Sequence, residues 1–192
     1  QPAIQSLLSK LDLPINAIDA VAVSAGPGSY TGLRVGLSTA KGLCYTLQKP
    51  LIMINTLEVM ACAAMFEIKD HAQKNGPLLF CPMIDARRME VFMALFSDKL
   101  DYVIPPTALV LTEVEAGFFP KDTIIVFSGS GSTKFQAINT LQQAIYIKAR
   151  HEVKHLAYFG LKAFEQQQFA DLAYCEPFYI KEFFTPQPVM KN

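Results

Sequence analysis

The sequence predicts an α/β fold with two lobes, and two patterns along the chain support this prediction. Residues 18–76 alternate between short apolar segments and segments of helical periodicity, which is typical of α/β domains. In addition, a strand followed by a glycine-rich loop and a helix occurs twice, at residues 18–47 and at residues 124–143. Such an internal repeat indicates a fold that arose by duplication, with one unit in each lobe.

The first part of the chain contains five predicted elements. They are a helix at 2–11, a strand at 18–24, a helix at 31–47, a strand at 50–54 and a helix that begins after Asn55 and ends before 75–77. Asn55 is a good helix cap because Glu58 follows three residues later. The strand at 18–24 is almost wholly apolar, which favours a buried strand in a parallel sheet.

The helix predicted at 31–47 is apolar on more than one side, which indicates burial on two faces. Gly32, Gly36 and Ala40 recur at every fourth position, and such small residues let another helix approach closely. The simple interpretation is that this helix packs on a sheet. The more specific interpretation is that its second face meets a partner subunit. The residues expected at such a partner interface are Leu33, Gly36, Leu37, Ala40 and Cys44.

The second part of the chain contains a predicted hairpin, a repeat of the strand and loop, and a long helix. The expected elements are strands at 78–84, 91–96, 107–111, 124–128 and 144–148, and helices at 134–143 and 153–168. The hairpin turn carries Asp85, Arg87 and Glu90, which form a possible polar site or a solvated turn. Residues 176–181 are expected to be extended, and 186–192 to form a loose tail.

The loop between the first strand and its helix is a candidate anion site. Its residues in that role are Gly26, Gly28, Ser29, Thr31 and Gly32. A glycine-rich turn before a helix presents free N–H groups and the positive end of the helix dipole. However, no lysine follows Gly32 as in a phosphate-binding P-loop, and a connection without any ligand is equally compatible with the pattern.

The composition limits the classes of function. The 192 residues are 51% hydrophobic and 18% charged, with a net charge of zero, which argues against a free-standing nucleic-acid binder. So much apolar sequence favours burial of some surface against a partner. The four widely spaced cysteines are expected to be free thiols rather than disulfides or zinc ligands. No signal peptide or membrane span is evident, so we expect a cytoplasmic protein without membrane association.

The pentapeptide His151–His155 matches the HExxH motif of zinc proteases. That mechanism needs both histidines on one face of a continuous helix. Here a predicted strand ends only a few residues before His151, so the motif is expected to straddle a connection. We therefore give a zinc-dependent protease little weight, and we expect no metal site.

Three ordered segments resemble the TsaB (YeaZ) family of bacterial tRNA threonylcarbamoyladenosine biosynthesis proteins, once described as glycoprotease-like. The segments are Gly26–Gly36 continuing through Leu43, Ile84–Val91, and Glu176–Lys181. The resemblance implies the actin-like (ASKHA, RNase H-like) two-lobed fold. It also implies a first lobe at 1–76, a second lobe at 77–185 and a tail at 186–192. Because that family begins with further strands, we expect the first-lobe sheet to be incomplete.

The resemblance also implies a function. Members of this family act as non-catalytic partner or activator subunits that dimerise with the catalytic subunit TsaD, or with themselves in isolation. A TsaE-like ATPase joins the complex, which transfers a threonylcarbamoyl group to adenosine 37 of tRNA. This chain would then have no catalytic residue and no cofactor of its own, with ATP and metal on the partners and only indirect contact with tRNA. The competing hypothesis is an actin-like phosphotransferase that binds a nucleotide through both glycine loops, Gly26–Gly32 and Gly129–Gly131.

Overall fold

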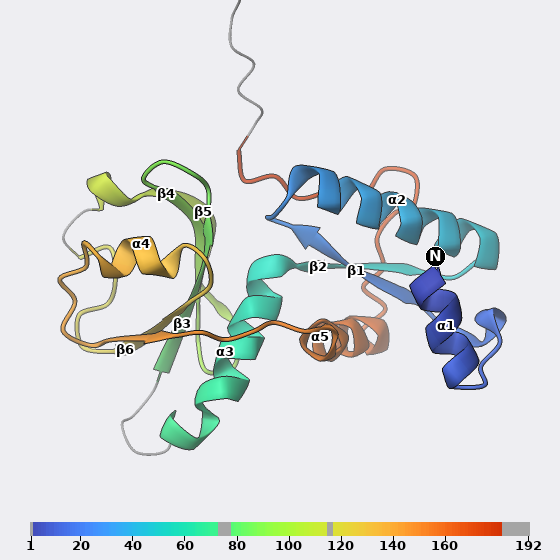
Figure 1. The fold of residues 1–192 in the computed structure, drawn as a ribbon, viewed down its shortest axis with the longest axis horizontal. Helices are drawn as coiled ribbons and strands as arrows, with labels where there is room; N and C mark the ends of the chain where they lie inside the picture. Colours follow the sequence, from blue (N-terminus) through green and yellow to red (C-terminus); the bar gives the residue numbers. More distant parts are fainter. Residues whose placement is uncertain (1, 73–77, 115–116, 182–192) are drawn as a thin grey trace, which may run out of the picture.

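The computed structural model describes residues 2–72, 78–114 and 117–181, which form two lobes, each organised around one sheet (Figure 1). The first lobe contains the two-stranded sheet β1–β2. The second lobe contains a five-stranded sheet with the strand order β5-β4-β3-β6-β7. Among the described residues, no helix is long and apolar enough to cross a membrane.

The first lobe is a sandwich in which helices cover both faces of a short parallel sheet. Strand β1 (Val21–Gly26) pairs in parallel with β2 (Leu51–Asn55). Helix α2 (Tyr30–Leu47) packs on one face and α5 (Val153–Glu165) on the other. Helix α1 (Pro2–Lys10) and a short 3-10 turn (Ile15–Ala17) precede β1, and no residue of α1 is buried. The two-stranded sheet agrees with the expected short first-lobe sheet.

The second lobe is a mixed sheet around an aromatic core. Strands β3 (Leu78–Asp85), β4 (Glu90–Phe96) and β5 (Tyr102–Val110) form an antiparallel meander, which a 3-10 turn follows at Leu111–Glu113. Strands β6 (Ile124–Ser128) and β7 (Ala144–Ile147) add in parallel to β3, with α4 (Ser132–Gln136) between them. The core of this lobe includes Phe80, Phe96 and Phe127, which are almost inaccessible to solvent.

Helix α3 (Thr56–Ala72) lies between the lobes and packs against both (Figure 1). Its start has the predicted cap: the amide of Leu57 donates to Oδ1 of Asn55 at 2.8 Å, and the amide of Asn55 donates to Glu58 at 3.2 Å. These bonds satisfy helix donors that would otherwise lack partners. The predicted end of this helix at 75–77 lies outside the described residues.

Two expectations about the second half need correction. Helix α4 ends at Gln136 rather than at 143, because Oδ1 of Asn139 accepts from the amide of Leu141 and forms a turn there. Strand β5 begins at Tyr102, five residues before the predicted start. The segment 176–181 lies outside the named strands, and the amide of Phe178 within it donates to the carbonyl of Ala25 in β1 at 2.7 Å.

The lobes are also not consecutive along the chain. Helix α5 packs on the β1–β2 sheet through Gly160 and Ala163, and the amide of Ala170 donates to the carbonyl of Leu51 at 2.8 Å. Residues 153–172 therefore lie with the first lobe, although a second lobe at 77–185 would include them. The expected boundary at 76 and the tail at 186–192 lie outside the described residues.

Candidate functional site

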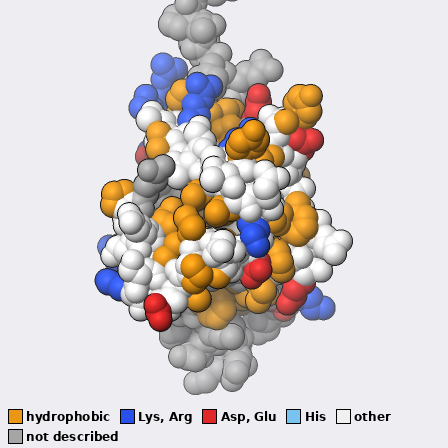
Figure 2. Space-filling model, turned by 90° about the vertical axis from the view of Figure 1, so that its right-hand side faces the viewer, with side chains coloured by type: hydrophobic (Ala, Val, Ile, Leu, Met, Phe, Trp, Pro, Cys, Tyr) orange, Lys and Arg blue, Asp and Glu red, His pale blue; other side chains and the backbone are white. Residues whose placement is uncertain are grey.

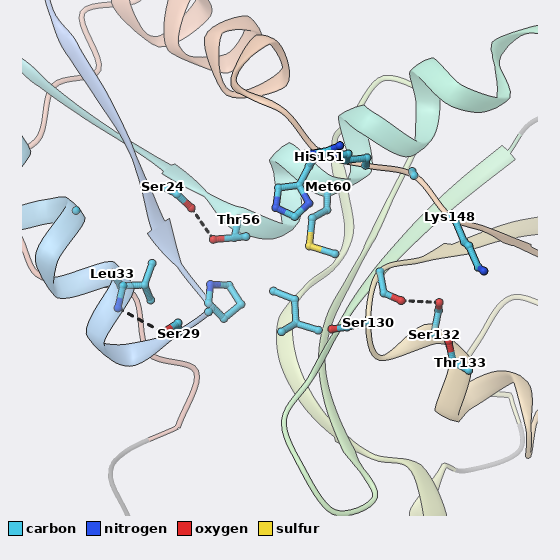
Figure 3. Close-up of a pocket in the computed structure, with 18 of the residues that line it drawn as sticks. Ser24, Ser29, Leu33, Thr56, Met60, Ser130, Ser132, Thr133, Lys148 and His151 are labelled. Carbon is cyan, nitrogen blue, oxygen red and sulfur yellow. Dashed lines mark hydrogen bonds between the residues drawn. The ribbon is translucent and has the colours of Figure 1, made fainter. Parts of the chain in front are cut away.

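A cleft of about 800 Å³ lies between the two lobes. Its walls follow the carboxyl ends of four strands, because β1 ends at Gly26, β2 at Asn55, β6 at Ser128 and β7 at Ile147. Open parallel sheets bind ligands at this edge, where loops from neighbouring strands meet. Figure 3 shows that residues of both lobes line the space, including Ser29, Thr56, Ser130, Lys148 and His151.

The hydroxyl groups around the cleft bond mostly within the chain. The hydroxyls of Ser24 and Thr56 share a hydrogen bond of 2.7 Å, and Ser132 donates to the carbonyl of Gly129 at 2.7 Å (Figure 3). The hydroxyl of Ser130 accepts from the amide of Asp85 at 3.0 Å. These bonds shape the two loops, and they leave fewer hydroxyl groups free to orient a ligand.

The charged groups on the cleft wall are all cationic or basic. Lys148, Arg150 and His151 follow β7, and no carboxylate occurs among the lining residues that the structure describes. A cleft of this kind favours an anionic or neutral ligand over a cation. Thr56 and Lys148 were not singled out from the sequence, although the rule that parallel strands end at one edge would have pointed to both.

The glycine-rich loop of the first lobe divides between the cleft and the interior. Gly28, Ser29 and Gly32 line the cleft, and Thr31 is exposed. Gly26 is buried with φ +117°, and a Cβ atom there would lie 2.5 Å from the carbonyl oxygen of Phe178. The loop therefore needs glycine at 26 for close packing rather than for a ligand. The hydroxyl of Ser29 caps the amide of Gly32 at 3.3 Å, so this donor is already used. The anion-binding role of the loop stays a prediction.

The three polar residues of the hairpin turn do not converge on one site. Asp85 accepts from the ammonium group of Lys134 at 2.6 Å and from the amide of Arg87 at 2.7 Å. These two bonds lower the pKa of the Asp85 carboxyl, with Lys134 as the larger cause. Glu90 instead forms an ion pair with Lys181. The turn is thus tied down by its own ion pairs.

Helix α2 buries the face that was expected to meet a partner. Leu37, Ala40 and Cys44 are 5%, 4% and 1% exposed, and they pack against the chain's own β1–β2 sheet. Leu33 and Gly36 are half-buried and line the cleft. Leu37, Ala40 and Cys44 are therefore covered by the chain itself, and the partner-interface role of Leu33 and Gly36 stays a prediction.

The side of α2 opposite the sheet is uncharged along its whole length. We call it the α2 strip, and it consists of Thr31, Val35, Ser38, Gly42 and Tyr45. Val35 and Tyr45 are 61% and 72% exposed, and beyond the adjoining part of α2 itself no described residue has an atom within 4 Å of the place where a Cβ atom on Gly42 would stand. An exposed helix normally carries charged residues on its solvent face. The strip is therefore suited to contact with another protein.

Both charged side chains of α2 point away from this strip, because the segment after α5 binds them. The guanidinium of Arg34 donates to the hydroxyl of Tyr179 at 3.3 Å. The ammonium of Lys41 donates to the carbonyl of Cys175 at 3.0 Å. Hydrophobic side chains also gather over the end of the molecule where α1 and the ends of α2 and α5 lie (Figure 2).

The HExxH pentapeptide does not lie within one helix. Helix α5 begins at Val153, so His151 and Glu152 precede it, as expected. Nδ1 of the buried His155 instead accepts a hydrogen bond from the amide of Glu152 at 2.9 Å and caps the helix. The described residues contain no group of three or more side chains that would hold a metal ion.

We expect His155 to make the stability of the protein depend on pH. Burial lowers the pKa of His155, with a smaller contribution from the positive charge of Lys154. Protonation at Nδ1 would also break the bond from Glu152. The free energy of unfolding should thus be highest above about pH 6.5, the ordinary pKa of an unfolded histidine, and fall as the pH drops below it.

Urea unfolding at several pH values between about 7.5 and 5.5 measures this effect. Replacement His155→Gln should remove much of the loss of stability in this range, whereas His151→Gln, at an exposed site, should keep it. Equal pH dependence in the wild type and in His155→Gln would contradict the assignment.

The sequence of this chain is similar to those of several known proteins. The family model described as TsaD: tRNA N6-adenosine threonylcarbamoyltransferase matches residues 1–182. The TsaB protein of Bacillus subtilis, a tRNA threonylcarbamoyladenosine biosynthesis protein, is 31% identical over 131 residues, 67% of this chain and 53% of the relative. The TsaB protein of Escherichia coli is 37% identical over 93 residues, 48% of this chain and 37% of the relative. The chain thus spans about half or less of the curated relatives it matches.

The solved structures agree with the fold. A protein with similarity to peptidase YEAZ from Pseudomonas aeruginosa has a TM-score of 0.75 at 20% identity and covers 94% of this chain and 82% of its own. YeaZ from the same organism has a TM-score of 0.74 at 21% sequence identity, and the match covers 93% of this chain and 82% of that protein. This likeness confirms the predicted α/β fold of the actin-like class, to which the matching family model belongs.

Proposed function

Because the chain belongs to the TsaD family of tRNA N6-adenosine threonylcarbamoyltransferases, we propose that it acts as a partner subunit in this tRNA modification. In this proposal it binds a TsaD-type catalytic subunit and supports the formation of threonylcarbamoyladenosine at position 37 of tRNA. The relatives named TsaB, at 31% and 37% identity, support the role of a partner rather than that of the transferase itself.

The observation that carries this proposal is the uncharged α2 strip. Its small central residue, Gly42, leaves room for the backbone of a second helix, while Val35 and Tyr45 provide exposed apolar contacts on either side. Small residues flanked by larger apolar ones allow two helices to pack at close range, and the loss of water from Val35 and Tyr45 would favour association.

The proposed complex assigns different tasks to its members. The TsaD-type subunit would carry the metal, the nucleotide and most of the contacts with tRNA, and a TsaE-type ATPase would join the pair. In the absence of the catalytic subunit, the same strip would pair two copies of this chain. This role belongs in the cytoplasm, where tRNA is modified.

Reconstitution tests the proposed function. Purified TsaD-type and TsaE-type proteins, tRNA and the activated threonylcarbamoyl donor are combined with and without this chain, and modified adenosine is measured by mass spectrometry of digested tRNA. We expect the product to form at least about tenfold faster with the chain present, equivalent to about 1.4 kcal/mol of barrier. An equal rate without the chain would refute the proposal.

A further inference from the structure

The segment that follows α5 returns along α2 and reaches the second lobe, and we propose that it is a latch that holds the two lobes together at the cleft. We call residues 169–181 the C-terminal segment. In Figure 1 this red segment leaves α5, passes beside α2 and ends on the side of the β3–β4 hairpin. The proposal concerns the chain itself and does not depend on the proposed function.

Hydrogen bonds fix the C-terminal segment to the first lobe at successive points. Its start donates from Ala170 to the carbonyl of Leu51, and its middle accepts at Cys175 from Lys41. Further on, the amide of Phe178 donates to the carbonyl of Ala25 at 2.7 Å. This last bond lies at the end of β1, one residue before the loop that enters the cleft wall. The segment thus follows the first lobe up to the edge of the cleft.

Two further contacts attach the C-terminal segment to the second-lobe side of the cleft. Ile180 packs against the core cluster that α3 shares with β3 and β6. The next residue, Lys181, forms an ion pair with Glu90 at the start of β4. Phe178 and Lys181 are three residues apart, so a short stretch of chain joins the end of β1 to the hairpin of the second lobe.

The ion pair is not an ordinary surface contact. The side chain of Glu90 is only 18% exposed, and its buried Oε1 atom has no donor among the described residues apart from Lys181. A mostly buried carboxylate without a partner is strongly unfavourable, so the docked position of Lys181 is stabilised by Glu90. By contrast, the side chains of the ion pair between Lys154 and Glu152 are 69% and 49% exposed, where such a contact contributes little.

The latch limits how far the two walls of the cleft can separate. The lobes are otherwise joined by α3 and by the connection from β7 to α5, and both run through or beside the cleft. A third attachment at Phe178 and Lys181 restricts rotation of one lobe against the other. Release of the C-terminal segment is therefore expected to let the cleft walls separate.

Hydrogen–deuterium exchange with mass spectrometry tests the latch on the variant Lys181→Gln. We expect exchange to become about tenfold faster at residues 25–32, 128–133 and 176–181. The expected change in exchange rate is moderate because the Glu90 side chain keeps some contact with water. Exchange in α3 and β3 should stay unchanged. The double variant Glu90→Gln with Lys181→Gln, which also lacks the ion pair, should show the same faster exchange as the single variant, and Lys154→Gln should match the wild type.

Three outcomes would overturn the latch. One is unchanged exchange at 25–32 and 128–133 in Lys181→Gln. Another is an equal rise throughout the core of both lobes, which would mean general destabilisation. The third is a double variant that exchanges as slowly as the wild type, since the ion pair would then not be what holds the segment.

Discussion

The substitution Leu37→Glu is expected to destabilise the protein by about 4 kcal/mol, which is enough to unfold much of the first lobe. Leu37 is 5% exposed and contributes to the cluster that joins α2 to the sheet. A carboxylate at this position would lose its water, and Lys41, one turn further along the helix, is already bound to the carbonyl of Cys175, while the cluster would lose an apolar side chain. Urea unfolding followed by circular dichroism measures the change.

The neighbouring residue provides the matched control. Ser38 lies one position further along the same helix and is exposed, so Ser38→Glu adds the same charge without burying it. We expect its free energy of unfolding to stay within about 0.5 kcal/mol of the wild-type value. If Leu37→Glu were as stable as Ser38→Glu, the face of α2 that packs on the sheet would have been assigned incorrectly.

Local signals in the sequence sufficed for much of the fold. The strands β1 and β2, the cap formed by Asn55 and Glu58, and the position of the HExxH motif across the start of α5 all follow from neighbouring residues. In each case the pattern involves residues close together in the chain, so periodicity and capping rules were enough.

The buried face of α2 was harder to predict because the helix is apolar or small on several sides. Leu37 and Cys44 differ from Val35 and Tyr45 only in which side meets the sheet, and composition does not decide this. The burial of Leu37 depends on Val21, Val23 and Met53, which belong to other elements. Only the tertiary structure could show that the strip at Val35 and Tyr45 is the free side.

Contacts between distant parts of the chain explain the remaining differences. Helix α5 returns to the first lobe through Gly160, which packs on Ala22, and residues so far apart in the sequence leave no local pattern. The same reason applies to the ion pair of Glu90 with Lys181, because the sequence only suggested that Glu90 belongs to a polar turn.

The largest effect on binding is expected for Val35→Glu. This side chain is 61% exposed on the α2 strip, so a carboxylate there is hydrated in the free chain and the fold should remain intact. In a complex through the strip the charge would be buried against an apolar surface, and we expect affinity for the TsaD-type subunit to fall about a hundredfold. Val153→Glu is the matched control, since Val153 is 79% exposed at the start of α5, on the other face of the sheet.

Titration calorimetry of the TsaD-type subunit encoded in the same genome, with the wild-type chain and these two variants, tests whether the α2 strip binds that subunit. We expect the wild type and Val153→Glu to bind with equal affinity and Val35→Glu to bind about a hundredfold more weakly, with all three folded by circular dichroism. Equal binding by all three chains, or no binding by the folded wild type, would contradict a partner interface on the α2 strip.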